Sequence, residues 1–497
     1  MRNFTRFLLV SSLSTLPLLV ACGDDSDSDK PASGGSGGTG ATGGGGSGGS
    51  GGGMAGGGGS MAGSGGSMAG SGGGGTGGAT GGTGGTGGST CDLAATKTVE
   101  DLTGKITASK KLTNDKHYML KGIVTVEAGA TLTIDPCTKI MGDKATTGTL
   151  VIKQGAKIIA DGKKDEPILF TSAAPVGSRA AGDWGGLIVL GKAPTNKTNP
   201  TIEGLTTNET YGGTDPTDDS GVLRFMRIEF GGVEIAANNE INGLTLGGVG
   251  NKTVVENIQV KHTLDDCFEF FGGTVNAKRL VCFRNGDDGL DFDFGYSGKV
   301  QFYFHQSDPS LADEANGFEW DTDGTNFTAT PPTNPTVYNA TLCGQNAVVA
   351  KQQYGMLLRR GVKGKIVNAI VTGFEAGVDL RDVPPTSVEL MNSVFFGNAP
   401  ENIAYVEDGS NSDTKKDDDK GFDEIGWFNT SGWNNTTNDP KLAGCFAATP
   451  NPIPASVIAG ATPPSDGFFD ATANYAGAFK DAAGNWMTGK WIDWADK

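Results

Sequence analysis

A short motif recurs through the middle of the chain: a small residue, an apolar residue, a residue that is usually acidic, and a second apolar residue. It reads Cys267-Phe268-Glu269-Phe270, Gly289-Leu290-Asp291-Phe292 and Gly317-Phe318-Glu319-Trp320, and continues as Gly355-Met356-Leu357-Leu358 and Gly377-Val378-Asp379-Leu380. Successive copies begin 22, 28, 38 and 22 residues apart. Alternation of this kind is typical of strands, and a recurring period near 22 residues predicts a solenoid.

A second apolar segment precedes each copy, at residues 257–260, 279–282, 299–302, 338–342 and 366–370. With frequent Gly and Asn at the turns, this pattern predicts an all-β, right-handed parallel β-helix, whose strands stack about 4.8 Å apart. Long inserts interrupt the repeat at residues 192–219, 307–316 and 323–335. Loops of this length often carry function.

Several phrases resemble a widespread group of Gram-negative surface lipoproteins. They are Gly182-Asp183-Trp184-Gly185-Gly186, residues 219–224, Ile228-Glu229-Phe230-Gly231-Gly232, residues 239–246 and residues 268–275. The resemblance covers roughly residues 91–497. It implies a right-handed parallel β-helix similar in shape to pectate lyases, in a group whose members mostly lack an assigned activity.

The first 22 residues are typical of a secretory signal peptide. Arg2 and Arg6 precede an apolar stretch at residues 7–20, which is too short to cross a bilayer. The stretch ends in Leu19-Val20-Ala21-Cys22, which resembles a lipobox and implies a covalent lipid on Cys22. The following Gly23 resembles the outer-membrane signal, so we expect an outer-membrane lipoprotein at the cell surface, with the periplasmic face left open.

Residues 23–90 hold 35 of the 82 glycines of the chain. The stretch from Ser33 to Thr90 is almost entirely Gly, Ser, Thr and Ala, with too little apolar surface to fold. We expect a disordered tether with a mean reach of roughly 40 Å. The predicted domains are therefore a signal peptide at 1–22, a tether at 23–90, a β-helix at 91–420 and a C-terminal cap at 421–497.

The C-terminal region departs from the repeat and contains five of the seven tryptophans: Trp427, Trp433, Trp486, Trp491 and Trp494. A solenoid needs its open end covered, because unpaired strand edges template aggregation. An aromatic cap is the favoured interpretation. The alternative is a platform on which sugar rings stack.

Six cysteines remain beside Cys22, and an even number in an exported protein suggests up to three disulfides. Fifteen pairings are possible. The favoured set joins Cys91 to Cys137, Cys267 to Cys282, and Cys343 to Cys445.

The repeat aligns acidic residues into two columns that face away from the apolar interior. One column holds Glu269, Asp291 and Glu319, and the other holds Asp293 and Asp321. Stacked like charges destabilise a sheet unless a counter-ion, a shared proton or arginines offset them. Calcium prefers six to eight oxygen ligands, so these five residues are candidate Ca²⁺ ligands. A solvated face with surface ion pairs is the alternative.

Two functions from different classes fit these features. The first is a lipid-anchored, monomeric, non-enzymatic module that binds polysaccharides or neighbouring surface proteins. The second is a Ca²⁺-dependent polysaccharide lyase acting on acidic glycans, in which the resemblance to pectate lyases implies Arg359 or Arg381 as the base. A net charge of −17 argues against nucleic-acid binding. The run Lys415–Lys420 is interpreted as a solvated loop.

Overall fold

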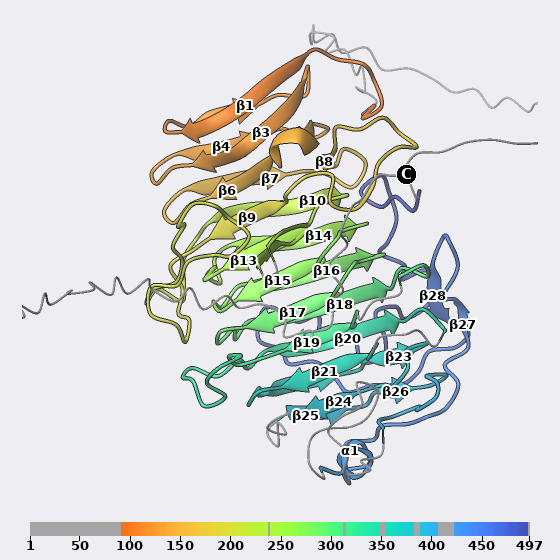
Figure 1. Cartoon of the computed structure of the whole chain (residues 1–497). Coiled ribbons are helices and arrows are strands. Elements are labelled where there is room, and N and C mark those ends of the chain that lie inside the picture. Colours follow the sequence, from red (N-terminus) through yellow and green to blue (C-terminus); the bar gives the residue numbers. More distant parts are fainter. Residues whose placement is uncertain are drawn as a thin grey trace, which may run out of the picture. The chain divides into compact units, whose positions relative to one another are not determined.

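The computed structural model describes residues 91–236, 239–311, 315–347, 353–381, 388–405 and 422–495. Cys22, the signal peptide, the tether and the run Lys415–Lys420 lie outside the described residues. Within the described ranges, 24 strands join in one network of parallel pairs and stack as a β-helix (Figure 1). The right-handed parallel β-helix predicted from the repeat is confirmed. No helix in the described part of the chain has the length and apolarity that a membrane span requires.

The first face of the β-helix carries the recurring motif. Each strand pairs in parallel with the equivalent strand of the next coil, as Phe268 pairs with Leu290. The strands in stacking order are β6 (Thr149–Ile152), β9 (Leu187–Leu190), β13 (Leu244–Gly247), β15 (Phe268–Phe271), β17 (Leu290–Asp293), β19 (Phe318–Trp320), β21 (Met356–Arg359) and β24 (Asp379–Arg381).

The second and third faces are the two halves of long strands that bend in the middle. The bend falls on residues in the left-handed conformation, among them Asn257, Asn339 and Asn368 with φ of 57°, 58° and 62°, which suits Asn because it tolerates positive φ. The long strands are β10 (Gly221–Glu229), β14 (Val254–Lys261), β16 (Asn276–Phe283), β18 (Lys299–Gln306) and β20 (Thr336–Cys343).

Shorter strands continue these two faces at both ends of the stack. On the second face they are β4 (Thr131–Ile134), β7 (Lys157–Asp161), β22 (Gly364–Val367) and β25 (Val388–Met391). On the third face they are β5 (Lys139–Gly142), β8 (Ile168–Ser172), β23 (Ile370–Thr372) and β26 (Val394–Phe395). The first coil contains β1 (Val99–Ile106) and β2 (Lys110–Leu112), and β3 (His117–Val126) pairs with β1 on the next coil. A 3₁₀ turn, η1 (Lys144–Thr146), follows β5.

Two antiparallel hairpins and one short helix lie outside the coils. They are β11 (Val233–Ala236) with β12 (Asn239–Ile241), β27 (Leu442–Gly444) with β28 (Asn451–Pro454), and α1 (Glu424–Phe428).

Apolar side chains at alternate positions of the strands fill the interior of the coils and form the core. Phe268, Phe270, Leu290 and Phe292 are fully buried and stack from coil to coil, with the rings of Phe270 and Phe292 5.1 Å apart. Burying one such side chain stabilises the fold by about 1.5–3 kcal/mol. The apolar residues of the motif therefore face this core, and the residue between them faces the outer surface.

The described part of the chain contains three disulfides, with the pairing favoured from the sequence: Cys91–Cys137, Cys267–Cys282 and Cys343–Cys445. The Cys267–Cys282 bond lies inside the coils, where both residues are fully buried. Cys343–Cys445 joins β20 to the C-terminal region. The bonds therefore secure the first coil, the middle of the core and the C-terminal region.

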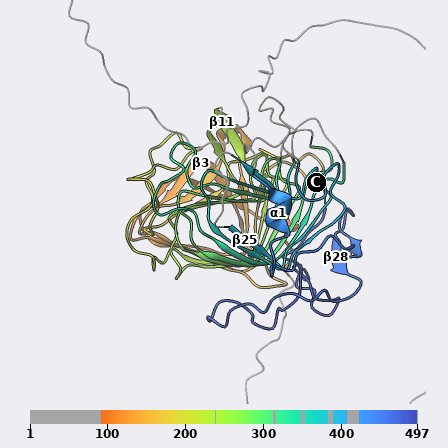
Figure 2. The same ribbon diagram turned by 90° about the horizontal axis from the view of Figure 1, so that it is seen from below.

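The C-terminal region does two things where the sequence predicted one. Residues 422–436 close the open end of the stack: Trp427 donates to the Val388 carbonyl at 3.1 Å, and α1 lies across the last coil in the view from below (Figure 2). Residues 441–495, the C-terminal strap, instead run back along the outer surface of the long strands. There Asn339 donates to the Tyr475 carbonyl at 2.7 Å. The Trp491 amide donates to the Lys164 carbonyl at 3.2 Å.

Three of the five tryptophans therefore belong to the strap rather than to an end cap. Trp486 and Trp491 pack with Phe479 on Val281 and Phe304 of the long strands, and Trp494 packs edge-on against Phe283. The strap is long enough to reach the early coils, which the predicted cap at 421–497 did not anticipate. Trp491 is fully buried, so its ring serves packing and is not available for stacking on a sugar.

Candidate functional site

The first face brings the predicted acidic residues into register. Glu269 of β15 pairs with Asp291 of β17, and Asp291 pairs with Glu319 of β19. Their neighbours Phe268, Phe270 and Phe292 point into the core, so these acids point outward, as the alternation predicts. Three carboxylates from successive coils are thus vertical neighbours.

The acids are largely buried, which argues against the alternative of a solvated face with surface ion pairs. Glu269 and Glu319 are each only 5% exposed. The insert at residues 191–220 folds over this face, and its Ile202 and Tyr211 pack in an apolar cluster with Phe271 and Phe294. The face carries outward-pointing phenylalanines beside its acids, and covering those rings also removes the acids from water.

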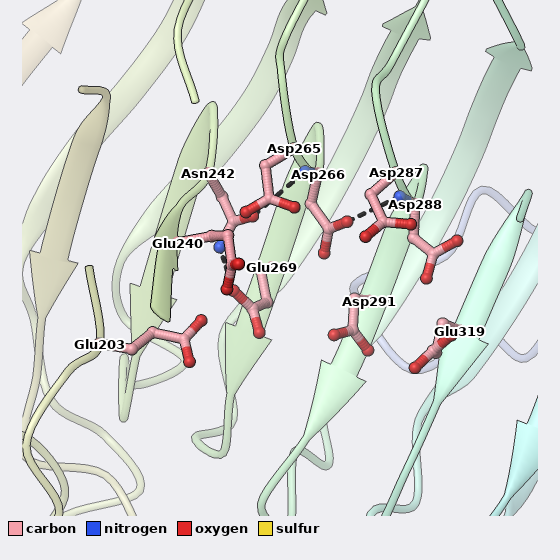
Figure 3. Close-up of a pocket in the computed structure, with 10 residues that line it drawn as sticks. All are labelled: Glu203, Glu240, Asn242, Asp265, Asp266, Glu269, Asp287, Asp288, Asp291 and Glu319. Atoms are coloured by element: carbon pink, nitrogen blue, oxygen red, sulfur yellow. Dashed lines mark hydrogen bonds between the residues drawn. The ribbon is translucent and has the colours of Figure 1, made fainter. Parts of the chain in front are cut away.

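A cavity of about 40 Å³ opens between the first face, the insert and the hairpin β11–β12. Nine carboxylates and one amide line it (Figure 3): Glu203, Glu240, Asn242, Asp265, Asp266, Glu269, Asp287, Asp288, Asp291 and Glu319. We call it the acidic cavity. Asp265 and Asp287 at the turns are partly exposed, whereas Asp266 and Glu269 are buried. The rim of the cavity is therefore accessible to solvent and its floor is buried.

Hydrogen bonds fix the floor of the acidic cavity. Asn242 donates from Nδ2 to Glu269 Oε2, and its Oδ1 accepts from the Asp266 amide at 3.2 Å. Asp266 Oδ1 in turn accepts from the Asp288 amide at 2.7 Å (Figure 3). The Asp-Asp pairs at the ends of successive coils therefore act partly as turn-forming residues, and the coil period repeats their positions along the cavity.

Burial and mutual repulsion control the charge of the cavity. Burial, with the nearby carboxylates of Glu203 and Asp291, raises the pKa of Glu269 well above its ordinary value. Burial and the neighbouring Glu319 likewise raise the pKa of Asp291. Asp291 Oδ1 is buried without a hydrogen-bond partner. A buried carboxylate oxygen without a donor is costly, and a cation at this place would remove the cost.

The donor set fits a hard cation. One carboxylate oxygen from each of Asp266, Glu269 and Asp291 lies within 4.8 Å of the other two, and Asp265, Asp266 and Asp287 form a second such group. Oxygens bound to one Ca²⁺ lie 2.3–2.6 Å from the ion and so within about 5 Å of each other. Both groups share Asp266. The chemistry and spacing therefore suit Ca²⁺.

The five predicted ligands divide into two sets, which corrects the expectation of a single site. Glu269, Asp291 and Glu319 line the acidic cavity, but Asp293 and Asp321 of the second column do not. The reason is that side chains two residues apart on a strand are about 6–7 Å apart along it.

In the second column, protein cations pair with Asp321. Asp321 Oδ2 accepts from Arg359 Nε at 3.0 Å and from Arg360 Nη1 at 2.9 Å. Arg359 Nη2 also donates to Glu319. Asp293 accepts from the Phe294 amide at 2.6 Å, and burial together with Asp321 raises its pKa well above its ordinary value. Ion pairing here does what a bound cation would otherwise do.

The second candidate base, Arg381, is also paired. It donates to Asp379 Oδ2 at 2.6 Å and to the Tyr354 hydroxyl at 3.2 Å. Arg359 is 4% exposed and bridges two carboxylates. Partners of this kind favour the charged guanidinium, whereas a base must be neutral to accept a proton. The pairing therefore favours a structural use of both arginines.

Two residues of the cavity had no signal in the repeat. Glu203 comes from the insert, and burial with the nearby Asp265 raises its pKa well above the ordinary value. Glu240 comes from β12, in one of the phrases that carried the family resemblance, but outside the recurring motif. The turn aspartates 265, 266, 287 and 288 also line the cavity.

The fold and cavity together define a parallel β-helix with an acidic pocket on one face. The family model described as a pectate-lyase-like β-helix domain matches residues 104–439. The chain therefore belongs to the pectate-lyase-like β-helix family. Comparisons with curated proteins and with solved structures found no match.

Proposed function

We propose that this protein is a non-enzymatic, Ca²⁺-dependent binding module, attached to the outer membrane through a lipid on Cys22 and acting at the cell surface. Its ligands would be acidic polysaccharides or neighbouring surface proteins. The observation that carries the proposal is the acidic cavity, in which carboxylates from successive coils converge.

Calcium explains why so many acids are held together. Two carboxylates one strand spacing apart repel by about 3–4 kcal/mol at an effective dielectric of 20. A divalent ion between Asp266, Glu269 and Asp291 would convert this repulsion into attraction. The partly exposed rim at Asp265 and Asp287 would let a carboxylate of an acidic glycan complete the coordination of the ion.

Calcium binding is tested by titrating the purified full-length protein with CaCl₂ after EGTA treatment, using calorimetry and thermal unfolding. Free Ca²⁺ at 100 times the dissociation constant of a single site stabilises the folded protein by about 2.7 kcal/mol. We expect a rise of several degrees in the unfolding midpoint with Ca²⁺ and a smaller one with Mg²⁺. An unmoved midpoint and no heat of binding would exclude a tight site.

Ligand binding is tested with polygalacturonate as the probe and its fully methyl-esterified form as the control. The esterified chain has the same backbone without free carboxylates. We expect retention of the protein on polygalacturonate only with Ca²⁺, and no retention on the ester. Equal retention on both polymers would contradict an ion-bridged mode.

A polysaccharide lyase is the second candidate, because Arg359 contacts Glu319 on the cavity wall. The same polygalacturonate sample, followed by absorbance of unsaturated product, separates the two functions. The lyase requires product that depends on Ca²⁺ and disappears in Arg359→Lys. Binding without product supports the non-enzymatic module.

The anchor is tested separately. In cells fed a labelled fatty acid, we expect label on the wild-type protein and none on Cys22→Ser. The variant should leave the membrane fraction. Protease treatment of intact cells then decides which face of the outer membrane carries the domain, since only a surface domain is digested.

A further inference from the structure

The end of the C-terminal strap meets a buried lysine. Lys261, at the end of β14, has a side chain only 1% exposed, although lysine is rarely buried. Its Nζ lies 3.0 Å from Asp493 Oδ2 and donates to the Ala495 carbonyl at 2.8 Å. Gln259 of the same strand holds the backbone of Asp493 on both sides, with bonds of 3.0 and 2.8 Å. The amine and the carboxyl group are thus held in contact.

A second buried carboxylate completes the group. Glu229 of β10 is the register partner of Lys261, and its Oε1 lies 3.7 Å from Lys261 Nζ. The side chain is 2% exposed, and Oε1 also lies 2.9 Å from Arg227 Nε. Its other oxygen accepts from the Thr171 hydroxyl at 3.0 Å. Glu229 is therefore held in place by Thr171 and Arg227, with Oε1 directed toward both Arg227 and Lys261.

Aromatic rings shield this group. Lys261 Nζ lies 5.9 Å from the centre of the Phe230 ring. Phe283, the neighbour of Lys261 on the next coil, packs against Trp494 with ring centres 5.0 Å apart. Trp494 directly follows Asp493 in the strap. These rings exclude water from the amine of Lys261, whereas the side chain of Asp493 is 33% exposed. The two groups condense from their neutral forms.

We propose that Lys261 and Asp493 form an intramolecular isopeptide bond, with Glu229 as the catalytic residue that transfers protons. The neutral amine of Lys261 attacks Cγ of Asp493, and a C–N bond forms. Glu229 takes a proton from the nitrogen and returns it to the departing oxygen of Asp493. The C–O bond breaks and one water leaves. No oxidant, reductant or cofactor takes part, because no atom changes oxidation state.

Nearby cations set the rate of this step. Arg227 Nε lies 2.9 Å from Glu229 Oε1, and Arg227 Nη2 lies 3.8 Å from Asp493 Oδ2. The nearby charges of Lys261 and Arg227 lower the pKa of Asp493 despite its burial. The ion pair is thus the resting state and the neutral pair is the rarer one. We therefore expect bond formation over hours after folding rather than at once.

The isopeptide bond would attach the C-terminal end of the strap to the coils. Cys343–Cys445 already ties the beginning of the strap to β20. Cys343 and Lys261 both lie on the third face, on coils that β16 and β18 separate. A bond at each end would prevent the strap from lifting off the coils unless the backbone is cut. Such a covalent clasp suits a domain exposed to proteases and mechanical stress.

The test is peptide mapping of the purified full-length protein after overnight incubation, with disulfides reduced and alkylated before trypsin digestion. Trypsin cannot cleave after a modified lysine. We expect a branched peptide in which residues 253–278 are joined to residues 491–497, with the combined mass reduced by one water. Linear peptides ending at Lys261, with no branched species, would overturn the proposal.

Three controls separate the bond from an artefact and from misfolding. The pair Lys299–Asp466, at 2.5 Å but with a lysine side chain 38% exposed, is an internal control that should give only linear peptides. Glu229→Gln retains the amine and the acid and should abolish the branched peptide, with folding checked by circular dichroism. Wild-type protein kept in urea from lysis onward should also remain linear. A branched peptide in any of these controls would contradict the assigned mechanism.

Discussion

Glu269 of β15 and Asp291 of β17 are direct register partners on adjacent coils, and both carboxyl groups point into the acidic cavity (Figure 3). At one strand spacing of about 4.8 Å, two ionised carboxylates repel strongly in a partly desolvated site. Burial raises the pKa of both groups; repulsion by Glu203 and Asp291 adds to the rise at Glu269, and repulsion by Glu319 and Asp293 adds to the rise at Asp291. The metal-free protein therefore keeps protons in the cavity at pH values where ordinary carboxyl groups are ionised.

This relationship predicts an unusual pH dependence of stability. An acid whose pKa is higher in the folded than in the unfolded protein adds stability at low pH, and that stability is lost as pH rises through the folded-state pKa. In EGTA, we expect the unfolding midpoint to fall as pH rises from about 5 to 8. Saturating Ca²⁺ should remove most of this fall, and its binding should release protons into a weak buffer. A midpoint that is insensitive to both would contradict the prediction.

Replacing one acid tests the same electrostatics without a pH change. Glu269→Gln removes a buried ionisable group and leaves an oxygen that can accept from Asn242. We expect the metal-free variant to be more stable than wild type by about 1–3 kcal/mol at neutral pH, and to lose most of the Ca²⁺-induced shift.

The matched control for Glu269→Gln is Glu389→Gln, because Glu389 lies on the exterior with a side chain 42% exposed. It should change the free energy of unfolding, measured in urea, by less than about 0.5 kcal/mol and leave the response to calcium intact. If both variants behave alike, the effect does not come from the cavity.

Removing a cation from the second column should have the opposite effect. Arg359 is bonded to Glu319 and Asp321, so Arg359→Met leaves two buried carboxylates with less compensation. We expect a loss of about 3–5 kcal/mol in the free energy of unfolding. Lys365→Met breaks an exposed pair with Glu389 and should cost at most about 1 kcal/mol. Equal costs for the two variants would show that the buried network is not stabilising.

The repeat predicted the coils and the register because it is local and periodic. Most copies of the motif have an acid between two apolar residues, and a small residue directly precedes them. This acid marks the same position in each of these coils, and the observed pairs Glu269–Asp291 and Asp291–Glu319 follow from it. Steps of 22 and 28 residues did not disturb the register, because the extra residues form loops outside the strands. The sequence therefore predicted which side chains of each strand face the core and which face outward.

The cover over the first face could not be predicted in the same way. Glu203 reaches the cavity from a non-repeating insert, and no periodic signal relates residue 203 to residue 269. The same holds for the strap, whose contacts join residues far apart in the chain, as in the bond of Lys490 Nζ to the Cys91 carbonyl at 2.9 Å. The high tryptophan content of the C-terminal region indicated that this region packs against the coils, but not against which part of them. Burial of the acids, and hence their raised pKa values, depended on these long-range contacts.

The strap itself gives the last prediction. Cys343–Cys445 closes a loop with a sequence separation of 102 residues, and a loop of this size restricts the unfolded chain by about 4–5 kcal/mol. In the double variant Cys343→Ser, Cys445→Ser, we expect a loss of about 2–5 kcal/mol. The first effect should be local, because the strap binds mainly through side-chain amides and a few rings. The amides of Ala476 and Ala478 should exchange with deuterium faster, while the amide of Leu280 inside the stack keeps its protection. Adding Asp493→Ala should extend this faster exchange to Trp491. Uniform exchange along the strap and the coils would instead show that the strap and the β-helix unfold as a single unit.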